Sequence, residues 1–169
     1  MPKDRGFTLI EMMVTVMVMA IALTIAIPSF NNTIRNSQLA SASNQLVGSL
    51  QQARSEAIKR RATLYLQAGG SSAAWANGWS IASVDSSVRD GETVETVTRL
   101  LNFDPPAGTI RISAASGNTS LTRLGFNRNG ELTGVTSASF NVCVTGKPEG
   151  RSVSLNRFGR VIVSATACS

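Results

Sequence analysis

The chain has 169 residues, of which 43% are hydrophobic and 15% charged, enough for one modest folded domain plus an appended segment. Its 16 Lys and Arg against 10 Asp and Glu, with no His, give a net charge of +6. Without His, the two Cys cannot complete a zinc site, and the commonest general base is missing. The sequence also has no P-loop and no nucleophile motif. We therefore expect no metal, no cofactor, no small-molecule substrate and no enzymatic activity.

An apolar run occupies residues 7–27 and contains one charged residue, Glu11. As a helix at about 1.5 Å per residue it is roughly 31 Å long, close to the thickness of the hydrocarbon core of a membrane. Because Lys3 and Arg5 precede the run, the positive-inside preference places the N-terminus in the cytoplasm and the rest of the chain outside. The run, closed by Pro28, therefore predicts a single membrane-spanning helix over residues 7–28. It leaves Glu11 unexplained, since an acidic residue near the centre of a span costs about 2.5–3.5 kcal/mol.

Two other interpretations of this run are open. A cleaved secretory signal is one, since Ala20-Ile21-Ala22 has the form of a cleavage site. Glu11 counts against it, because the apolar region of such a signal carries no charge, and cleavage there would leave residues 23–27 as an apolar N-terminus. The other is a plain anchor in which Glu11 stays hydrated near the lipid headgroups.

Residues 6–11, with the sequence GFTLIE, resemble the type IV prepilin cleavage motif. The resemblance implies that residues 1–6 are a leader, that prepilin peptidase cuts after Gly6, and that Phe7 becomes the methylated N-terminus. The new positive charge then lies four residues before Glu11 on the same helical face. The Glu11 carboxylate can neutralise it in its own or a neighbouring subunit, and a paired charge is tolerated in an apolar setting. The family favours the neighbour, which makes Glu11 an assembly residue.

Pro28 ends the apolar run and lacks a backbone donor, so we expect a kink or local unwinding near residues 24–28. Pilins commonly have a proline here, although the helix could simply stop. Residues 29–61 predict an amphipathic helix. Its apolar residues recur every three or four positions: Leu39, Ala42, Leu46, Leu50, Ala53 and Ala57.

Residues 62–169 predict a β-rich head, because short alternating runs are separated by turn residues. Asn129-Gly130 predicts a two-residue hairpin, and 69–77 and 85–93 predict loops. The fold class is therefore α+β, one long helix followed by an antiparallel β domain. The candidate strands are 62–68, 78–84, 94–101, 109–114, 121–127, 131–136, 139–145, 151–157 and 160–166.

Cys143 and Cys168 are 25 positions apart. An exported chain meets an oxidising compartment, where such a pair closes into a disulfide. The chain-entropy model gives roughly 3–4 kcal/mol of stabilisation for a loop of this length.

The head also resembles the GspH/FimT family of minor pilins and pseudopilins, so that the resemblance covers nearly the whole chain. The segments that carry it are QARSEAIKR at 52–60, WANGW at 75–79, FNRNG at 126–130, VC at 142–143 and NRFGR at 156–160. The same segments have a structural interpretation, with Trp79 in the core and Gly78, Gly130 and Gly159 in turns.

The resemblance implies a pilin-like fold, with one long N-terminal helix packed on an antiparallel sheet. It implies a single-pass protein of a Gram-negative inner membrane with its head in the periplasm, whose partners are prepilin peptidase and other major and minor pilins or pseudopilins. The implied function is to prime or cap a type IV pilus or a type II secretion pseudopilus, at the filament tip.

An alternative function is DNA binding. Some relatives resemble receptors for DNA uptake in natural transformation, with arginines around a C-terminal Gly-Arg-x-Arg element. Here Gly159-Arg160 is followed by Val161-Ile162, so the second arginine is missing. Phosphate contacts of this kind are sequence-independent and salt-sensitive. The candidate residues are Arg151, Arg157 and Arg160, with Arg123 and Arg128 as additions.

Overall fold

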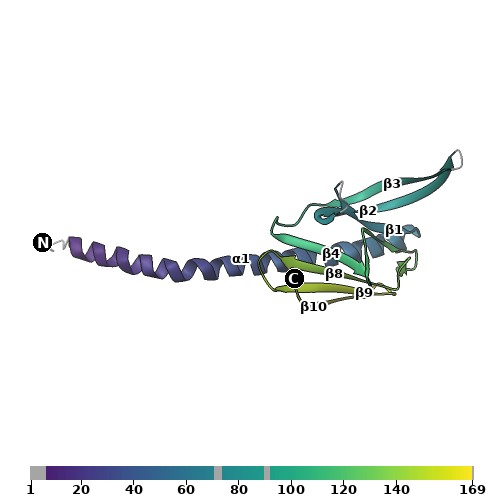
Figure 1. Ribbon diagram of the computed structural model, residues 1–169. Helices are drawn as coiled ribbons and strands as arrows, with labels where there is room; N and C mark the ends of the chain where they lie inside the picture. Colours follow the sequence, from purple (N-terminus) through teal and green to yellow (C-terminus); the bar gives the residue numbers. More distant parts are fainter. Residues whose placement is uncertain (1–6, 71–73, 90–91, 169) are drawn as a thin grey trace. The chain divides into compact units, whose positions relative to one another are not determined.

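The computed structural model describes residues 7–70, 74–89 and 92–168. The predicted leader, including Gly6, lies outside the described residues. The chain divides into two compact units, 1–37 and 38–169, which are described separately below. One helix, α1 (Leu9–Arg60), runs through both units. The strands are β1 (Leu64–Gly69), β2 (Ala74–Arg89), β3 (Glu92–Phe103), β4 (Ile110–Ser116), β5 (Thr119–Ser120), β6 (Arg123–Phe126), β7 (Leu132–Thr133), β8 (Ser137–Val144), β9 (Glu149–Asn156) and β10 (Val161–Ala167) (Figure 1).

In the N-terminal unit, α1 remains helical through Pro28. The alternative in which the helix stops at Pro28 is therefore wrong, and so is the local unwinding expected at 24–28; a bend there stays a prediction. A proline removes one hydrogen bond, and a 52-residue helix keeps enough of the others on both sides to continue. Among the described residues, no helix combines the length and the hydropathy that a membrane span requires.

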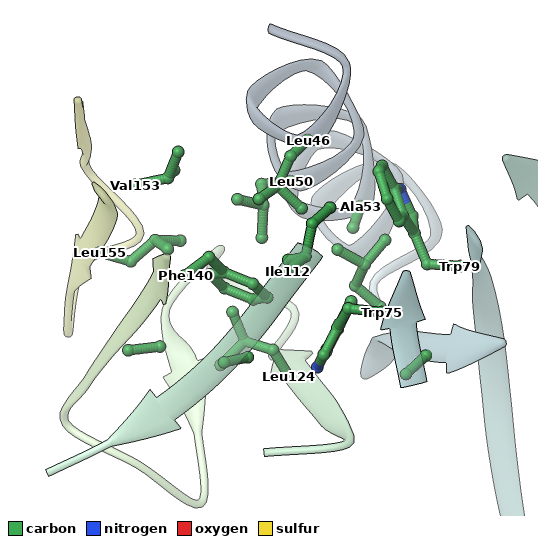
Figure 2. Close-up of a cluster of buried hydrophobic side chains, with 14 of the residues drawn as sticks. Leu46, Leu50, Ala53, Trp75, Trp79, Ile112, Leu124, Phe140, Val153 and Leu155 are labelled. Atoms are coloured by element: carbon green, nitrogen blue, oxygen red, sulfur yellow. The ribbon is translucent and has the colours of Figure 1, made fainter. Parts of the chain in front are cut away.

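The second unit contains two five-stranded antiparallel sheets with the strand orders β3-β2-β1-β6-β7 and β10-β9-β8-β4-β5. The predicted apolar stripe of α1 is confirmed, because all six of its residues are buried against these sheets. Figure 2 shows Leu46, Leu50 and Ala53 facing Phe140 of β8 across the core. The predicted α+β class, a long helix packed on antiparallel sheets, is confirmed.

Trp79 lies in this core with 2% of its surface exposed, as predicted. Its indole Nε1 donates a hydrogen bond to the buried Ser49 hydroxyl at 2.8 Å, and its ring stacks on Phe103. A buried indole N–H needs a hydrogen-bond acceptor, and the Ser49 hydroxyl supplies it. This bond explains why a serine is tolerated within the apolar stripe of the helix.

Parts of the strand prediction are wrong. Residues 74–77 and 85–89 belong to β2, and β3 begins at residue 92, although these positions were expected to be loops. The polar side chains of Asp85, Ser86 and Ser87 are all exposed, so this part of the ribbon buries neither face and shows no hydrophobic alternation. The two-residue strand β5 was not predicted, because so short a strand carries no pattern.

The C-terminus of α1 closes with two backbone bonds, Ala62 N–H to Ala57 O and Arg61 N–H to Ile58 O, both at 3.2 Å. This is the Schellman pattern, and its left-handed position is held by Arg61 with φ = 54°. Glycine normally takes that position because a Cβ is strained there.

We therefore expect Arg61→Gly to stabilise the head by about 1 kcal/mol, which thermal or urea unfolding of the purified protein would measure. Arg60→Gly, inside the last helical turn, is the comparison variant and should destabilise it by about 1 kcal/mol or more, because it adds a glycine to the helix and removes the ion pair with Glu56. A loss of stability in Arg61→Gly would contradict the strain argument.

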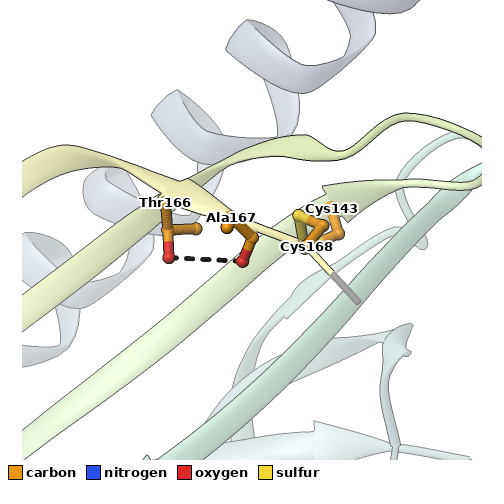
Figure 3. Close-up of a disulfide and its surroundings, with 4 residues drawn as sticks. All are labelled: Cys143, Thr166, Ala167 and Cys168. Carbon is orange, nitrogen blue, oxygen red and sulfur yellow. Dashed lines mark hydrogen bonds between the residues drawn. A yellow bond between two sulfur atoms is a disulfide. The ribbon is translucent and has the colours of Figure 1, made fainter.

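The predicted disulfide between Cys143 and Cys168 is present, with a Cα–Cα distance of 6.0 Å. Cys143 lies on β8 and Cys168 directly follows β10, so the bond crosses β9 at Gly150, the register partner of Cys143 (Figure 3). A Cβ on Gly150 would meet the Cys168 sulfur and would lie 2.6 Å from the Val142 carbonyl oxygen. Glycine at this position makes the crossing feasible.

Candidate functional site

The first candidate site is the start of α1. Thr8 precedes the helix, and its Oγ1 accepts the backbone N–H of Glu11 at 3.3 Å while its carbonyl accepts that of Met12 at 3.2 Å. Thr8 is therefore the N-cap, and Glu11 lies three residues further on, where the helix dipole favours a negative charge. Phe7 is the residue immediately before the cap and is 76% exposed.

The helix surface that follows is apolar on all sides. Every residue from Phe7 to Thr24 is exposed, and no residue between them except Glu11 is charged. Large apolar side chains exposed in this number need a nonpolar environment, because water does not solvate such a surface favourably.

The second candidate site is in the head and consists of two turns with the same construction, residues 127–131 (NRNGE) and 156–160 (NRFGR). We call them the twin turns. In each, the asparagine Oδ1 accepts the backbone N–H groups two and four residues further on, at 2.9 and 3.1 Å from Asn127 and at 3.1 and 3.0 Å from Asn156. The glycine at the fourth position donates its N–H to the asparagine carbonyl at 2.9 Å in both turns.

This construction replaces the predicted two-residue hairpin at Asn129-Gly130, which is wrong. A type I′ hairpin needs positive φ at both central residues, and only Gly130 has it, with φ = 76°. The Asn127 side chain instead satisfies the backbone donors, which allows a five-residue loop.

The twin turns pack on each other and on α1. Leu132 N–H donates to Arg157 O at 2.8 Å, and Arg54 Nε donates to Gly130 O at 2.9 Å. A Cβ on Gly159 would lie 2.7 Å from Gly130 O and 2.9 Å from Arg54 Nε. The glycine is therefore required for close approach as well as for its φ of 72°.

Three exposed arginines project from the twin turns, Arg128, Arg157 and Arg160, and we call them the arginine face. Within the described part of the chain, none of their guanidinium groups has a hydrogen-bond or ion-pair partner. The nearby basic end of α1 differs, because Glu56 pairs with Arg60 at 2.8 Å and with Lys59 at 3.7 Å. The hydrogen bond from Arg60 lowers the pKa of Glu56.

The other two predicted arginines lie elsewhere. Arg123 pairs with Glu95 at 3.0 Å and lies over the Tyr65 ring at 5.4 Å, and the Glu95 hydrogen bond raises its pKa. Arg151 is half-buried beside Val142 and lies near the start of β9, whereas the arginine face begins where β9 ends. The structure therefore brings together three of the five candidates.

The arginine face borders a groove of about 570 Å³ between α1 and the start of β10. Arg54 and Arg160 line it together with Ile58 and the exposed Phe158, and no acidic residue is among the lining. Guanidinium groups in this setting can bind carboxylate or phosphate oxygens. No group of His, Cys, Asp or Glu side chains able to hold a metal ion occurs in the described ranges.

Sequence reasoning missed the structural part of this site, namely Asn127, Asn156 and Arg54. A signal for the asparagines exists, because FNRNGEL at 126–132 and LNRFGRV at 155–161 share an apolar–Asn–Arg–x–Gly–charged–apolar pattern. Arg54 has no such signal, since only the packing of α1 against the turns selects it from the other helix arginines.

Known proteins match both parts of the chain. The family model described as type II transport protein GspH matches residues 42–159, and the model of the prokaryotic N-terminal methylation motif matches residues 1–27. No curated protein gives a significant match.

Among solved structures, two crystal forms of the type IV minor pilin FimU from Pseudomonas aeruginosa strain PAO1 match this fold. The P21 form has a TM-score of 0.61 and 28% identity, and covers 79% of this chain and 94% of FimU. The P65 form has a TM-score of 0.58 and 29% identity, and covers 77% and 97%. The chain therefore belongs to the GspH family, as a pilin-like protein with an N-terminal methylation motif and the fold of a minor pilin.

Proposed function

We propose that this protein is a minor pilin or pseudopilin subunit that helps to prime or cap a type IV pilus or a type II secretion pseudopilus. Prepilin peptidase removes residues 1–6 and leaves methylated Phe7 as the N-terminus. Before assembly the subunit resides in the inner membrane with its head in the periplasm. It then joins other pilins or pseudopilins at the filament tip.

The observation that carries this proposal is the start of α1, where Glu11 occupies the first turn of a helix that is otherwise exposed and apolar as far as Thr24. Lipid covers such a surface before assembly, and the helices of neighbouring subunits cover it afterwards. The transfer exchanges one apolar environment for another, so it gives little net hydrophobic driving force. Selectivity then comes from polar contacts.

Glu11 supplies such a contact. The Phe7 amino group created by cleavage is a positive charge next to the positive end of the helix dipole, which is unfavourable. The Glu11 carboxylate of a neighbouring subunit can neutralise both the amino group and the positive end of the helix dipole. An unpaired charge at this depth is costly, so a subunit is stable in the filament only in the register that pairs the two.

We expect Glu11→Ala to leave a membrane-bound protein with methylated Phe7 but to reduce its amount in sheared filaments at least about tenfold, equivalent to about 1.4 kcal/mol. Mass spectrometry of the mature N-terminus and quantitative blotting of filament and membrane fractions would measure the two effects. Thr15→Ala is the matched control, because the Thr15 hydroxyl bonds to the carbonyl of Met12 in its own helix and to no other group that the structure describes.

Normal incorporation of Glu11→Ala would remove the assembly role from this residue. A wild-type protein that retains Met1, or that begins at Leu23, would remove the processing step and with it the filament function.

The arginine face favours a second candidate function, binding of DNA during uptake. Three guanidinium groups without an acidic partner among the described residues lie on adjacent turns, which suits contact with successive phosphates. Binding of this kind would be independent of sequence and strongly dependent on salt.

If this function is correct, the purified head retards any duplex DNA at low salt. The double variant Arg157→Ala with Arg160→Ala reduces the magnitude of the slope of log K against log salt concentration by about two. Each lost phosphate contact reduces that slope by about one. Arg123→Ala is the control and leaves binding unchanged, since Glu95 already holds that guanidinium. No retardation at low salt, or an unchanged slope in the double variant, would exclude the function.

A further inference from the structure

The two sheets have four edge strands, β3, β7, β5 and β10, and three of them have features that discourage pairing with another chain. Strands β5 and β7 have two residues each. Strand β3 carries Glu95 and Arg99 along its length. Short length and charged side chains are the usual protection of a sheet edge. Strand β10, with the sequence VIVSATA, is seven residues long and has no charge and no proline.

On the outer side of β10, no strand among the described residues pairs with its backbone. Asn156 N–H donates to Arg160 O, and Cys168 N–H donates to Pro148 O, so the even-numbered residues face β9. By the alternation of an antiparallel ladder, the N–H and C=O groups of Val161, Val163 and Ala165 point away from the sheet. An extended chain is the ligand that satisfies such a row of donors and acceptors.

The side chains of β10 add an apolar surface to this edge. Val163 is the register partner of Val153, which is fully buried in the core, yet Val163 is 47% exposed. A groove of about 600 Å³ runs beside it, lined by Leu39 of α1, by Val163, Ala165 and Ala167 of β10, and by the charged Glu149 and Arg151 of β9. The core face of the sheet therefore continues onto β10 without cover from the helix.

The two ends of strand β10 have different surroundings. At its start, the groove that Arg54 and Arg160 line reaches Val161 and has no acidic lining residue. At its end, the disulfide ties Cys168 to β8. The edge is therefore tied to the sheet at its end, and the positive charge at its start favours a carboxylate.

We propose that β10 is a docking edge for an extended segment of a neighbouring filament subunit, which adds to the sheet as a further strand. The segment pairs with the outward backbone groups of β10 and places an Asp or Glu side chain against Arg54 and Arg160. The proposal rests on the filament function proposed above and supplies the head-to-head contact that the apolar helix cannot provide.

Ala165→Pro in the full-length protein tests this proposal. Proline removes an N–H that the sheet does not use, so the head should keep its melting temperature within a few degrees, while pairing with an added strand is lost. The expected result is at least a roughly tenfold loss from sheared filaments, with the membrane pool unchanged. Ala165→Ser, which keeps the N–H, is the matched control and should incorporate normally.

A second variant, Val163→Lys, places a charge in the groove without altering the backbone and should also block incorporation. If Ala165→Pro does not fold, the Val163→Lys variant and the hydrogen-exchange measurement together test the docking edge. The outward-facing amides of Val163 and Ala165 in the wild type should exchange about tenfold more slowly in filaments than in the purified protein, because strand addition protects them.

The outcomes separate the two proposals. Normal incorporation of Ala165→Pro, or unprotected Val163 and Ala165 amides in the filament, would overturn the docking edge alone. Loss with Val163→Lys but not with a folded Ala165→Pro would indicate a helix in the groove and would also overturn strand addition. Absence of the wild type from filaments would overturn the filament function and this inference together.

Discussion

Gly150→Ala is expected to destabilise the head by about 3 kcal/mol or more, because it either leaves Cys143 and Cys168 unpaired or displaces the pairing of β8 with β9. The disulfide crosses β9 directly over Gly150, and a Cβ there would meet the Cys168 sulfur and lie 3.1 Å from that of Cys143. The same Cβ would also lie 2.6 Å from the Val142 carbonyl oxygen. The variant must therefore either open the disulfide, which costs about 2–5 kcal/mol in a small exported domain, or displace the β8–β9 pairing.

Thiol titration under denaturing conditions and urea unfolding of the oxidised protein would measure these two effects. Gly108→Ala is the matched control, because a Cβ at Gly108 has nothing within 4 Å and its φ is not in the left-handed region. It should change stability by less than about 1 kcal/mol. A Gly150→Ala protein with an intact disulfide and normal stability would show that the crossing can adjust, contrary to this account.

The helix was the most predictable part of the fold, and the reason is its periodicity. All six stripe residues from Leu39 to Ala57 are buried, because one face of this helix packs on the sheets and the other meets solvent. Pro28 was the exception. A local rule predicted a kink or local unwinding there, and the helix continues through this residue without unwinding.

The strands were less predictable wherever neither face of a ribbon is buried. Asp85, Ser86 and Ser87 pair with β3, but their side chains are polar and exposed, so this stretch has the composition of a loop. The two strands pair there because β2 and β3 continue together beyond the core as one hairpin. The sequence pattern of a single strand does not indicate this pairing.

The candidate site was predictable in its charges but not in its geometry. Arg157 and Arg160 are four residues or fewer from Asn156 and lie in one turn by necessity. Arg128 joins them because the two turns pack on each other, as in the bond from Leu132 N–H to the Arg157 carbonyl, and sequence spacing does not encode such contacts. Arg123 is close to Arg128 in sequence, yet its partner Glu95 comes from β3 and removes it from the face.

The twin turns give the second prediction. Gly130, Gly134 and Gly159 all have positive φ, of 76°, 78° and 72°. They differ in what surrounds them, since a Cβ at Gly134 would have nothing within 4 Å, whereas one at Gly159 would lie 2.7 Å from Gly130 O. Gly134→Ala therefore measures the backbone strain alone, and Gly159→Ala measures the strain plus the contact between the turns.

We expect Gly134→Ala to cost about 1 kcal/mol, and Gly159→Ala about 2–4 kcal/mol, because overpacking against rigid backbone adds about 1–3 kcal/mol to the strain. Urea unfolding of both heads would give the difference. Part of it should disappear when Arg54→Ala is combined with Gly159→Ala, since the Arg54 side chain is the neighbour able to move. Equal costs for the two glycine variants would mean that the turns do not depend on their mutual packing, and the arginine face would then lack the rigid support described for it.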